Sequence, residues 1–311
     1  MKVLRSLERA RGLLRRPVVT IGNFDGVHRG HQVILQRLRR EAEARGTKAV
    51  VLTFEPHPVS VVRPDAAPPG VMLLADRLAA LAAEGVDVAV VQHFSRKFAA
   101  IDADDFVRRF LAEILDADHL LVGDDLNFGR DRGGNVATLT AAGERLGFTV
   151  EVVAPVEVDG VVARSSVIRG LIAAGDVSAA GRLLGRSHFV RGRIEQGAGR
   201  GKGLGFATAN LKPATPLVPG DGVFATVARL GRRRIDSVTS IGTTPTFGGT
   251  SRVIEAHLFA EFGDLYGKPM VLEFLEKIRD QRRFESPAAL AGQIGADVAR
   301  ARQVLAALKG P

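Results

Sequence analysis

The chain has 311 residues, with 43 lysines and arginines against 34 aspartates and glutamates, so its net charge is +9. Hydrophobic residues make up 46% and cysteine is absent, which predicts globular domains and excludes disulfides, thiolate metal sites and cysteine nucleophiles. No apolar run reaches the roughly 18 residues of a membrane span, and Met1–Arg16 is a poor signal peptide. We therefore expect a cytoplasmic protein of two domains with no membrane partner.

The positive charge leaves two classes of partner open, nucleic acids and small polyphosphates. Proteins that bind single strands usually stack bases on aromatic side chains, and here aromatic residues are 5%, with one tyrosine and no tryptophan. We expect no nucleic-acid partner on that ground. Arginines on solvated helix faces are the plain alternative explanation of the charge.

Strands and helices alternate through the first half of the chain. A buried strand is expected at 17–22, and further strands at 48–53, 86–91, 119–122 and 148–153. Helices are expected at 29–45, 74–84 and 136–146, with another that Asp104 or Asp105 caps and that runs to about Leu115. The alternation predicts an α/β domain, a parallel sheet with helices on both faces.

The pattern changes after two helical segments at 166–174 and 177–184. Short strands follow at 188–195, 222–229, 234–241, 252–258 and 270–276, separated by turns rich in glycine and proline. They predict a small antiparallel barrel or sandwich, on which an amphipathic helix at 287–308 packs. The predicted boundary lies near Gly185, which gives domains 1–185 and 186–311.

A turn with two histidines lies between the first strand and the first helix, at 21–31. Ligands of open parallel sheets bind outside the carboxyl ends of the strands, and a helix N-terminus offers N–H groups to phosphate. His28 and His31 are three residues apart, so both can face one pocket and donate to phosphate oxygens. A zinc site, which would need further ligands, and a plain surface role are the alternatives.

Three further segments, 53–58, 123–132 and 164–169, are expected at the same pocket, because the first two follow strands and the third opens a helix. The alternatives are helix capping by the serines and a turn role for Asp125. The candidate ligand residues in these segments are His57, Asp125, Arg132, Ser165, Ser166 and Arg169.

A second polar cluster begins with the glycine-rich segment 199–205, which is either a plain flexible loop or, with its cations, a polyphosphate loop. It is not a Walker A loop, because no serine or threonine follows Lys202. Thr208 and Asn210 are two apart on an extended segment, so they point the same way and offer oxygen ligands for Mg²⁺. By spacing alone, Glu255 is a solvent-facing strand residue.

In order and along nearly the whole length, these segments resemble the bacterial bifunctional riboflavin kinase/FMN adenylyltransferases, or FAD synthetases. The strongest matches are GNFDGVHRGH at 22–31 and TFEPHP at 53–58, while GFATAN at 205–210 resembles the kinase signature GFPTAN. The resemblance implies a Rossmann-like nucleotidyltransferase domain of the HxGH type, followed by a β-barrel riboflavin kinase domain. The chain departs from the pattern at four positions: Leu126, Arg164, Ser166 and Ala207.

The resemblance also implies the roles of single residues. His28 and His31 would contact the phosphates of ATP, Glu255 would be the base that accepts the proton of the riboflavin 5′-hydroxyl, and Mg²⁺ would bind Thr208 and Asn210. The other binding residues implied for the adenylyltransferase are Gly22, Asn23, Phe24, Asp25, Gly26, His57, Asp125, Arg132, Ser165, Ser166 and Arg169. Those implied for the kinase are Gly199, Lys202, Gly205, Thr208, Asn210 and Arg279.

The partners that follow are small molecules: ATP, riboflavin and FMN, with FAD as the final product. We expect a monomer or a weak homo-oligomer. Two alternatives keep the fold but change the function, namely an enzyme with the kinase activity alone, given Arg164 in the loop 164–169, and a flavin-binding regulator without turnover. The intact set of His28, His31, Thr208, Asn210 and Glu255 argues against the regulator.

Overall fold

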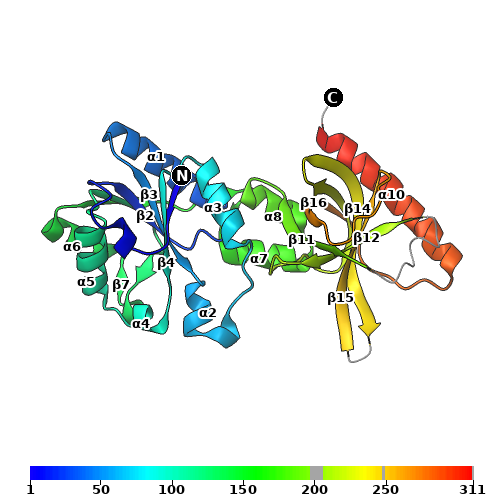
Figure 1. Cartoon of the computed structure of the whole chain (residues 1–311), viewed down its shortest axis with the longest axis horizontal. Coiled ribbons are helices and arrows are strands. Elements are labelled where there is room, and N and C mark those ends of the chain that lie inside the picture. Colours follow the sequence, from blue (N-terminus) through cyan, green and yellow to red (C-terminus); the bar gives the residue numbers. More distant parts are fainter. Residues whose placement is uncertain (197–205, 247–248, 310–311) are drawn as a thin grey trace. The chain divides into compact units, whose positions relative to one another are not determined.

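The computed structural model describes residues 1–196, 206–246 and 249–309. Contacts divide the chain into two compact units, Met1–Arg164 and Ser165–Pro311 (Figure 1). The first unit holds a parallel sheet and the second an antiparallel barrel, so the predicted fold class is confirmed. The helices α7 (Ser165–Ala174) and α8 (Val177–Leu184) fall in the second unit, and the boundary near Gly185 stays a prediction.

The sheet of the first unit has six strands, all paired in parallel, in the order β1-β4-β3-β2-β5-β8. These strands are β1 (Lys2–Leu4), β2 (Val18–Ile21), β3 (Ala49–Glu55), β4 (Val88–His93), β5 (His119–Gly123) and β8 (Thr149–Val153). From β2 the chain moves outward to β3 and β4, whereas β5 lies on the other side of β2 and leads to β8. The strand order therefore reverses between β2 and β5, and ligands of such sheets bind outside the carboxyl ends of the strands at this point.

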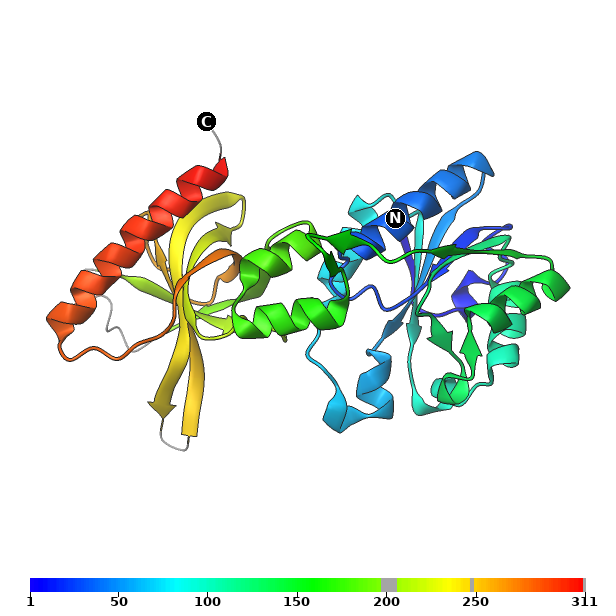
Figure 2. The ribbon, with the colours of Figure 1, turned by 180° about the vertical axis from the view of Figure 1, so that it is seen from behind.

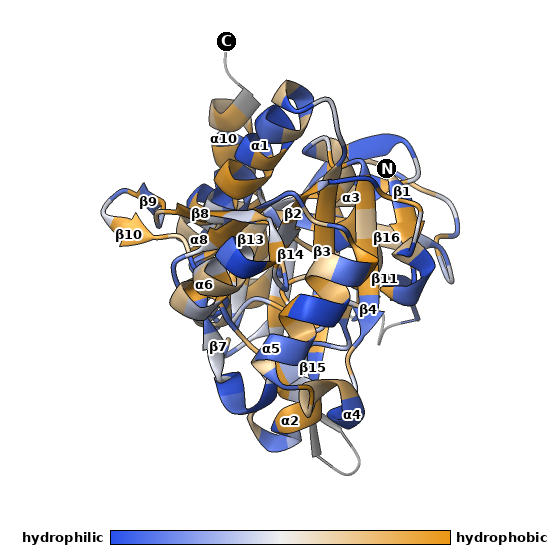
Figure 3. Cartoon of the chain, turned by 90° about the vertical axis from the view of Figure 1, so that its left-hand side faces the viewer, coloured by the Kyte–Doolittle hydropathy of each residue, from blue (hydrophilic) through white to orange (hydrophobic). Residues whose placement is uncertain are grey.

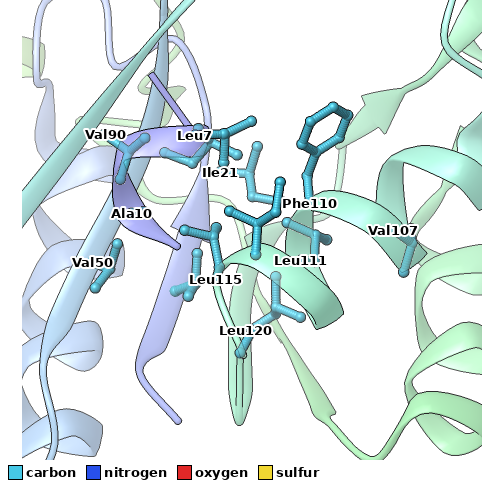
Figure 4. Packing of buried hydrophobic residues seen from close by; sticks show 14 of the residues in the cluster. Leu7, Ala10, Ile21, Val50, Val90, Val107, Phe110, Leu111, Leu115 and Leu120 are labelled. Carbon is cyan, nitrogen blue, oxygen red and sulfur yellow. The ribbon is translucent and has the colours of Figure 1, made fainter. Parts of the chain in front are cut away.

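Helices cover both faces of the sheet, because successive strand residues point to opposite sides. Val18 and Val51 pack with Leu38 of α1 (Arg29–Ala44) and with α3 (Leu74–Ala83). Their neighbours Val19 and Leu52 join the other core, under the π-helix η3 (Phe106–Ile114) and α6 (Val136–Leu146). Figure 3 shows the hydrophilic and hydrophobic sides of α1, and Figure 4 shows the core beneath η3.

Some local predictions were wrong. The helix expected to start at Asp104 or Asp105 instead starts at Ala103 as α5 (Ala103–Asp105), because Asp102 is the extended residue before it, and it continues as a π-helix. Strand β1 was missed, since it is short and lies among arginines.

The minor elements are η1 (Glu8–Ala10), α2 (Pro58–Val62), η2 (Pro64–Ala66), α4 (Arg96–Ala99), β6 (Asn127–Phe128), η4 (Arg130–Arg132), β7 (Gly134–Asn135), β9 (Glu157–Val158) and β10 (Val161–Val162).

The second unit is a closed antiparallel barrel in the order β11-β12-β15-β14-β13-β16, which decides between the barrel and the sandwich. Its strands are β11 (His188–Glu195), β12 (Thr208–Pro213), β13 (Gly222–Leu230), β14 (Arg233–Thr246), β15 (Gly249–Leu258) and β16 (Pro269–Arg279). Phe224 and Phe274 fill the interior. The predicted terminal helix, α10 (Pro287–Lys309), packs outside β13, β14 and β16 (Figure 2).

Within the described ranges, no helix combines the length and the apolar character that crossing a membrane requires.

Candidate functional site

The turn after β2 holds its backbone in an unusual conformation. Phe24 and Val27 have φ values of +50° and +40°, and Gly26 has +89°. Left-handed backbone is costly for residues other than glycine and persists only where the surroundings over-determine it. Here the side chains of Phe24 and Val27 are fully buried in the core beneath α1, and this anchorage fixes where the following histidines lie.

The two histidines stack at the start of α1. Their ring centroids are 3.7 Å apart, with 22° between the planes, and the Phe24 ring lies 4.9 Å from His31. His28 is the N-cap, and its Nδ1 accepts a hydrogen bond from the His31 N–H at 3.4 Å, so a neutral His28 ring carries its proton on Nε2. A Cβ on Gly30 would lie 3.2 Å from the His28 ring and 3.3 Å from the Ala163 carbonyl, so any larger residue here would have to displace one of these groups by a few tenths of an ångström.

Asn23 and Asp25, two other predicted ligands in this turn, differ in their surroundings. The buried Asp25 carboxylate accepts the Val71 N–H at 3.0 Å, which ties the turn to the segment before α3. The Asn23 Oδ1 atom is buried and accepts no hydrogen bond from the described residues. Asn23 is therefore the better placed of the two to bind a ligand, since a buried oxygen without a donor is costly.

The segment 53–58 lies beside the histidine turn, because β3 pairs with β2 in parallel and both strands end at the same edge. The Thr53 hydroxyl donates to the Asn23 carbonyl at 3.2 Å. His57 is the N-cap of α2, and its Nδ1 accepts the Val59 N–H at 3.2 Å. The neighbourhood of this segment and the turn is thus confirmed, while the ligand role of His57 stays a prediction.

Asp125 follows β5, on the other side of the point where the strand order reverses. Its side chain is exposed, and its backbone carbonyl accepts a hydrogen bond from the side-chain amide of Asn127 at 2.7 Å. Arg132 is exposed as well and has a φ of +61°. Both residues lie beyond the carboxyl end of a central strand, as expected for ligands, and their contacts with a nucleotide stay predictions.

Residues Ser165, Ser166 and Arg169 lie in the first two turns of α7, in the second compact unit. The predicted helix start is therefore confirmed. Their role as phosphate ligands stays a prediction, and so does the alternative of simple helix capping.

The barrel brings the second predicted cluster together. In the ladder of β12 and β15, Thr208 pairs with His257 and Asn210 with Glu255. These four side chains are half-buried on the outer face, whereas Ala209 and Ala256 between them point into the core. The Glu255 carboxylate makes no hydrogen bond or ion pair within the described part of the chain. An unpaired carboxylate next to an amide and a hydroxyl suits a proton acceptor at a phosphate site.

Two family models match the chain in tandem, FAD synthetase over residues 11–167 and riboflavin kinase over residues 184–305. The bifunctional riboflavin kinase/FMN adenylyltransferase of Pseudomonas fluorescens is 40% identical over 307 residues, which are 98% of each chain. The chain belongs to this family. The enzyme of the same description from Escherichia coli strain K12 is 37% identical over 287 residues, or 92% of each chain.

Membership of the riboflavin kinase/FMN adenylyltransferases confirms the resemblance that the motifs indicated. A crystal structure described as a macrolide-efflux protein from Streptococcus pneumoniae has the same fold, with a TM-score of 0.88. It is 30% identical and covers 96% of this chain and 98% of its own.

In this family member, Arg279 is already engaged. Its guanidinium makes a two-pronged ion pair with the buried Asp297 of α10, at 2.9 and 2.7 Å, and lies 5.7 Å from the Phe284 ring. A bidentate pair of this kind fixes a side chain strongly, so any contact with ATP or flavin stays a prediction. Gly199, Lys202 and Gly205 lie outside the described residues.

The zinc alternative finds no support in the part of the chain that the structure describes, where no three histidine, cysteine or acidic side chains gather as metal ligands. Thr208 and Asn210 provide neutral oxygen atoms beside the Glu255 carboxylate. Mg²⁺ prefers such hard oxygen ligands and usually keeps waters and substrate phosphates as its other ligands.

One residue at the edge of the first site, Arg77 of α3, is not among those predicted from the sequence. It is 5% exposed, and its guanidinium donates to the Asn23 carbonyl at 2.8 Å and to the Phe54 carbonyl at 3.1 Å. Burial lowers the pKa of Arg77, while the carboxylates of Glu55 and Asp25 oppose that shift. The signal in the sequence was a charged residue on the apolar face of a helix, between Leu74 and Leu81.

Proposed function

We propose that the chain phosphorylates riboflavin to FMN in the barrel domain and adenylylates FMN to FAD in the parallel-sheet domain, with ATP as the donor in both reactions. The observation that carries the proposal is the match to a bifunctional relative over 98% of the chain. Both candidate sites support it, since the stacked histidines lie at the reversal point of the sheet and Glu255 pairs with Asn210 on the barrel.

In the first domain, an oxygen of the FMN phosphate attacks the α-phosphorus of ATP. The bond from that phosphorus to the bridging oxygen of the β-phosphate breaks, and pyrophosphate leaves with the electron pair. His28, through its Nε2–H, and His31 donate hydrogen bonds to phosphate oxygens on which charge develops, and the N–H groups at the start of α1 add to this field. Catalysis rests on positioning and on these preorganised donors, without a covalent enzyme intermediate.

In the barrel domain, the 5′-hydroxyl oxygen of riboflavin attacks the γ-phosphorus of ATP, and ADP leaves as the bond to the bridging oxygen breaks. Glu255 accepts the hydroxyl proton, a role that its freedom from described partners supports. Thr208 and Asn210 would hold Mg²⁺, which when bound neutralises charge on the phosphates of ATP.

Further predictions belong to the same proposal. The domain boundary lies near Gly185, the protein works in the cytoplasm as a monomer or weak homo-oligomer, and it has no nucleic-acid partner. Ser165, Ser166 and Arg169 bind phosphate in the adenylyltransferase reaction.

The direct test is to incubate the purified full-length chain with riboflavin, ATP and Mg²⁺ and to separate the flavins by chromatography. The proposal predicts that FMN appears first and is then converted to FAD. An enzyme with the kinase activity alone would stop at FMN, and a regulator would bind flavin while ATP stayed intact. Either result would overturn the proposal of two activities.

A further inference from the structure

Arg77 is a buried cation that connects two segments of the first candidate site. It lies in the first turn of α3 and is 5% exposed. Taking a guanidinium out of water is costly unless its N–H groups find acceptors. A leucine at this helix position would pack against the apolar core without that cost, so the charge has a specific task.

The acceptors of Arg77 show what that task is. One terminal nitrogen donates to the Asn23 carbonyl at 2.8 Å, and the other donates to the Phe54 carbonyl at 3.1 Å and to the Glu55 carboxylate. Asn23 follows β2, whereas Phe54 and Glu55 end β3. One planar guanidinium thus spans the two chain segments from which His28, His31 and His57 follow.

The Asn23 carbonyl is held from two sides, since the Thr53 hydroxyl also donates to it at 3.2 Å. The next residue, Phe24, is the first with a positive φ in the turn that leads to the histidines. Strained backbone of this kind keeps its geometry only when neighbouring groups fix it. Arg77 and Thr53 supply such a fixed point immediately before the strain begins.

We propose that Arg77 is a positioning residue for adenylyl transfer, which sets the histidine turn and the segment 53–58 at their working separation. The inference rests on the proposed function of the first domain. Arg77 touches neither substrate and acts through the backbone of Asn23 and Phe54. Because catalysis by positioning loses rate steeply with small displacements, the effect falls on turnover and on the KM for FMN.

The test compares Arg77→Met, Arg77→Lys and the matched control Arg108→Met in the full-length chain. Arg108 is exposed on η3 and pairs only with Asp105 and Glu113 among the described residues. Each variant is assayed for FMN-to-FAD conversion and for riboflavin phosphorylation, at a temperature well below the midpoint of its thermal unfolding. The kinase reaction serves as an internal control, because it belongs to the barrel.

We expect Arg77→Met to lower kcat/KM for FMN at least about tenfold, a loss consistent with misplaced catalytic groups. Arg77→Lys should lower kcat/KM for FMN less than Arg77→Met does, because lysine keeps the positive charge. It should still lower it, because lysine lacks the two terminal nitrogens that reach Asn23 and Phe54 together. The kcat/KM of Arg108→Met for FMN should stay within about twofold of the wild-type value, the size of ordinary surface effects. The rate of riboflavin phosphorylation should stay within the same range in every variant.

An Arg77→Met variant with reduced thermal stability but unchanged kcat and KM for FAD formation would reduce Arg77 to a structural residue and overturn the inference. If Arg77→Met does not fold, Glu55→Gln replaces it, because Glu55 is half-exposed and the glutamine keeps an acceptor. That variant should raise the KM for FMN about threefold, and an unchanged KM would contradict us. A wild-type chain that makes no FAD would overturn the proposed function as well.

Discussion

Replacing the buried His188 with glutamine should make the barrel less sensitive to acid. His188 starts β11, is 2% exposed, and its Nε2 donates to the Leu217 carbonyl at 3.1 Å. Burial lowers the pKa of His188 from 6.5 to about 4, and Arg186 adds to the shift, although the bond to Leu217 opposes it. The folded barrel therefore keeps this ring neutral at pH values where the unfolded chain protonates it.

The sign and size follow from proton linkage. Well above pH 6.5 the ring is neutral in both states and contributes nothing to the pH dependence. As the pH falls below that value, the imidazole binds a proton in the unfolded chain but not in the folded barrel. The free energy of unfolding therefore falls by about 1.4 kcal/mol per pH unit. Between neutral pH and about pH 5 the loss attributable to His188 is about 2 kcal/mol.

Urea unfolding of the full-length chain at several pH values measures this loss. Tyr266 is the only tyrosine, and it lies in the barrel unit, so tyrosine fluorescence reports on that unit. His188→Gln keeps a donor for Leu217 and should reduce the acid-induced loss of stability by about 2 kcal/mol at about pH 5. Equal losses in the variant and the wild type would refute this explanation, because the titrating group would then lie elsewhere.

Three further predictions follow from the two sites and the barrel core. Gly30→Ala should slow FAD formation roughly three- to tenfold, because the added methyl group displaces the His28 ring by a few tenths of an ångström. The control Gly292→Ala should not slow it, since a Cβ there meets no atom within 4 Å. An unchanged rate in Gly30→Ala would contradict a positioning role for the His28 ring. Thr226→Val should cost about 1–3 kcal/mol in urea unfolding, since the buried hydroxyls that it bonds at 2.8 and 2.7 Å lose a partner; an unchanged midpoint would contradict this. Asn210→Ala should raise the Mg²⁺ concentration for half-maximal kinase activity about tenfold, and an unchanged requirement would remove it from the metal site.

The sequence predicted the frame of the first site well, because each element there has a strong local signal. The histidine turn lies between an apolar strand and an amphipathic helix, and strand alternation with helices implies a common edge for 22–31 and 53–58. Stacking of His28 on His31 could not be read from spacing. It depends on the left-handed turn through Phe24 and Val27, which only tertiary packing fixes.

The barrel site shows a different limit of sequence analysis. Alternation placed Thr208 and Asn210 on one face, but pairing with Glu255 depends on the register of β12 with β15, two strands far apart in the chain. Register is a property of the closed barrel and not of either strand alone. Arg77 was missed for a related reason, since the value of a buried charge lies in its distant acceptors, Asn23 and Phe54.

The central claim, two separate active sites in one chain, is tested most directly by supplying two substrates to two variants. Glu255→Gln and His31→Ala are each given ATP and Mg²⁺ with either riboflavin or FMN, and the flavins are separated by chromatography. We predict that Glu255→Gln makes almost no FMN yet converts supplied FMN to FAD at the wild-type rate. His31→Ala should make FMN normally and form FAD at least about tenfold more slowly. Loss of both activities in either folded variant would contradict the claim.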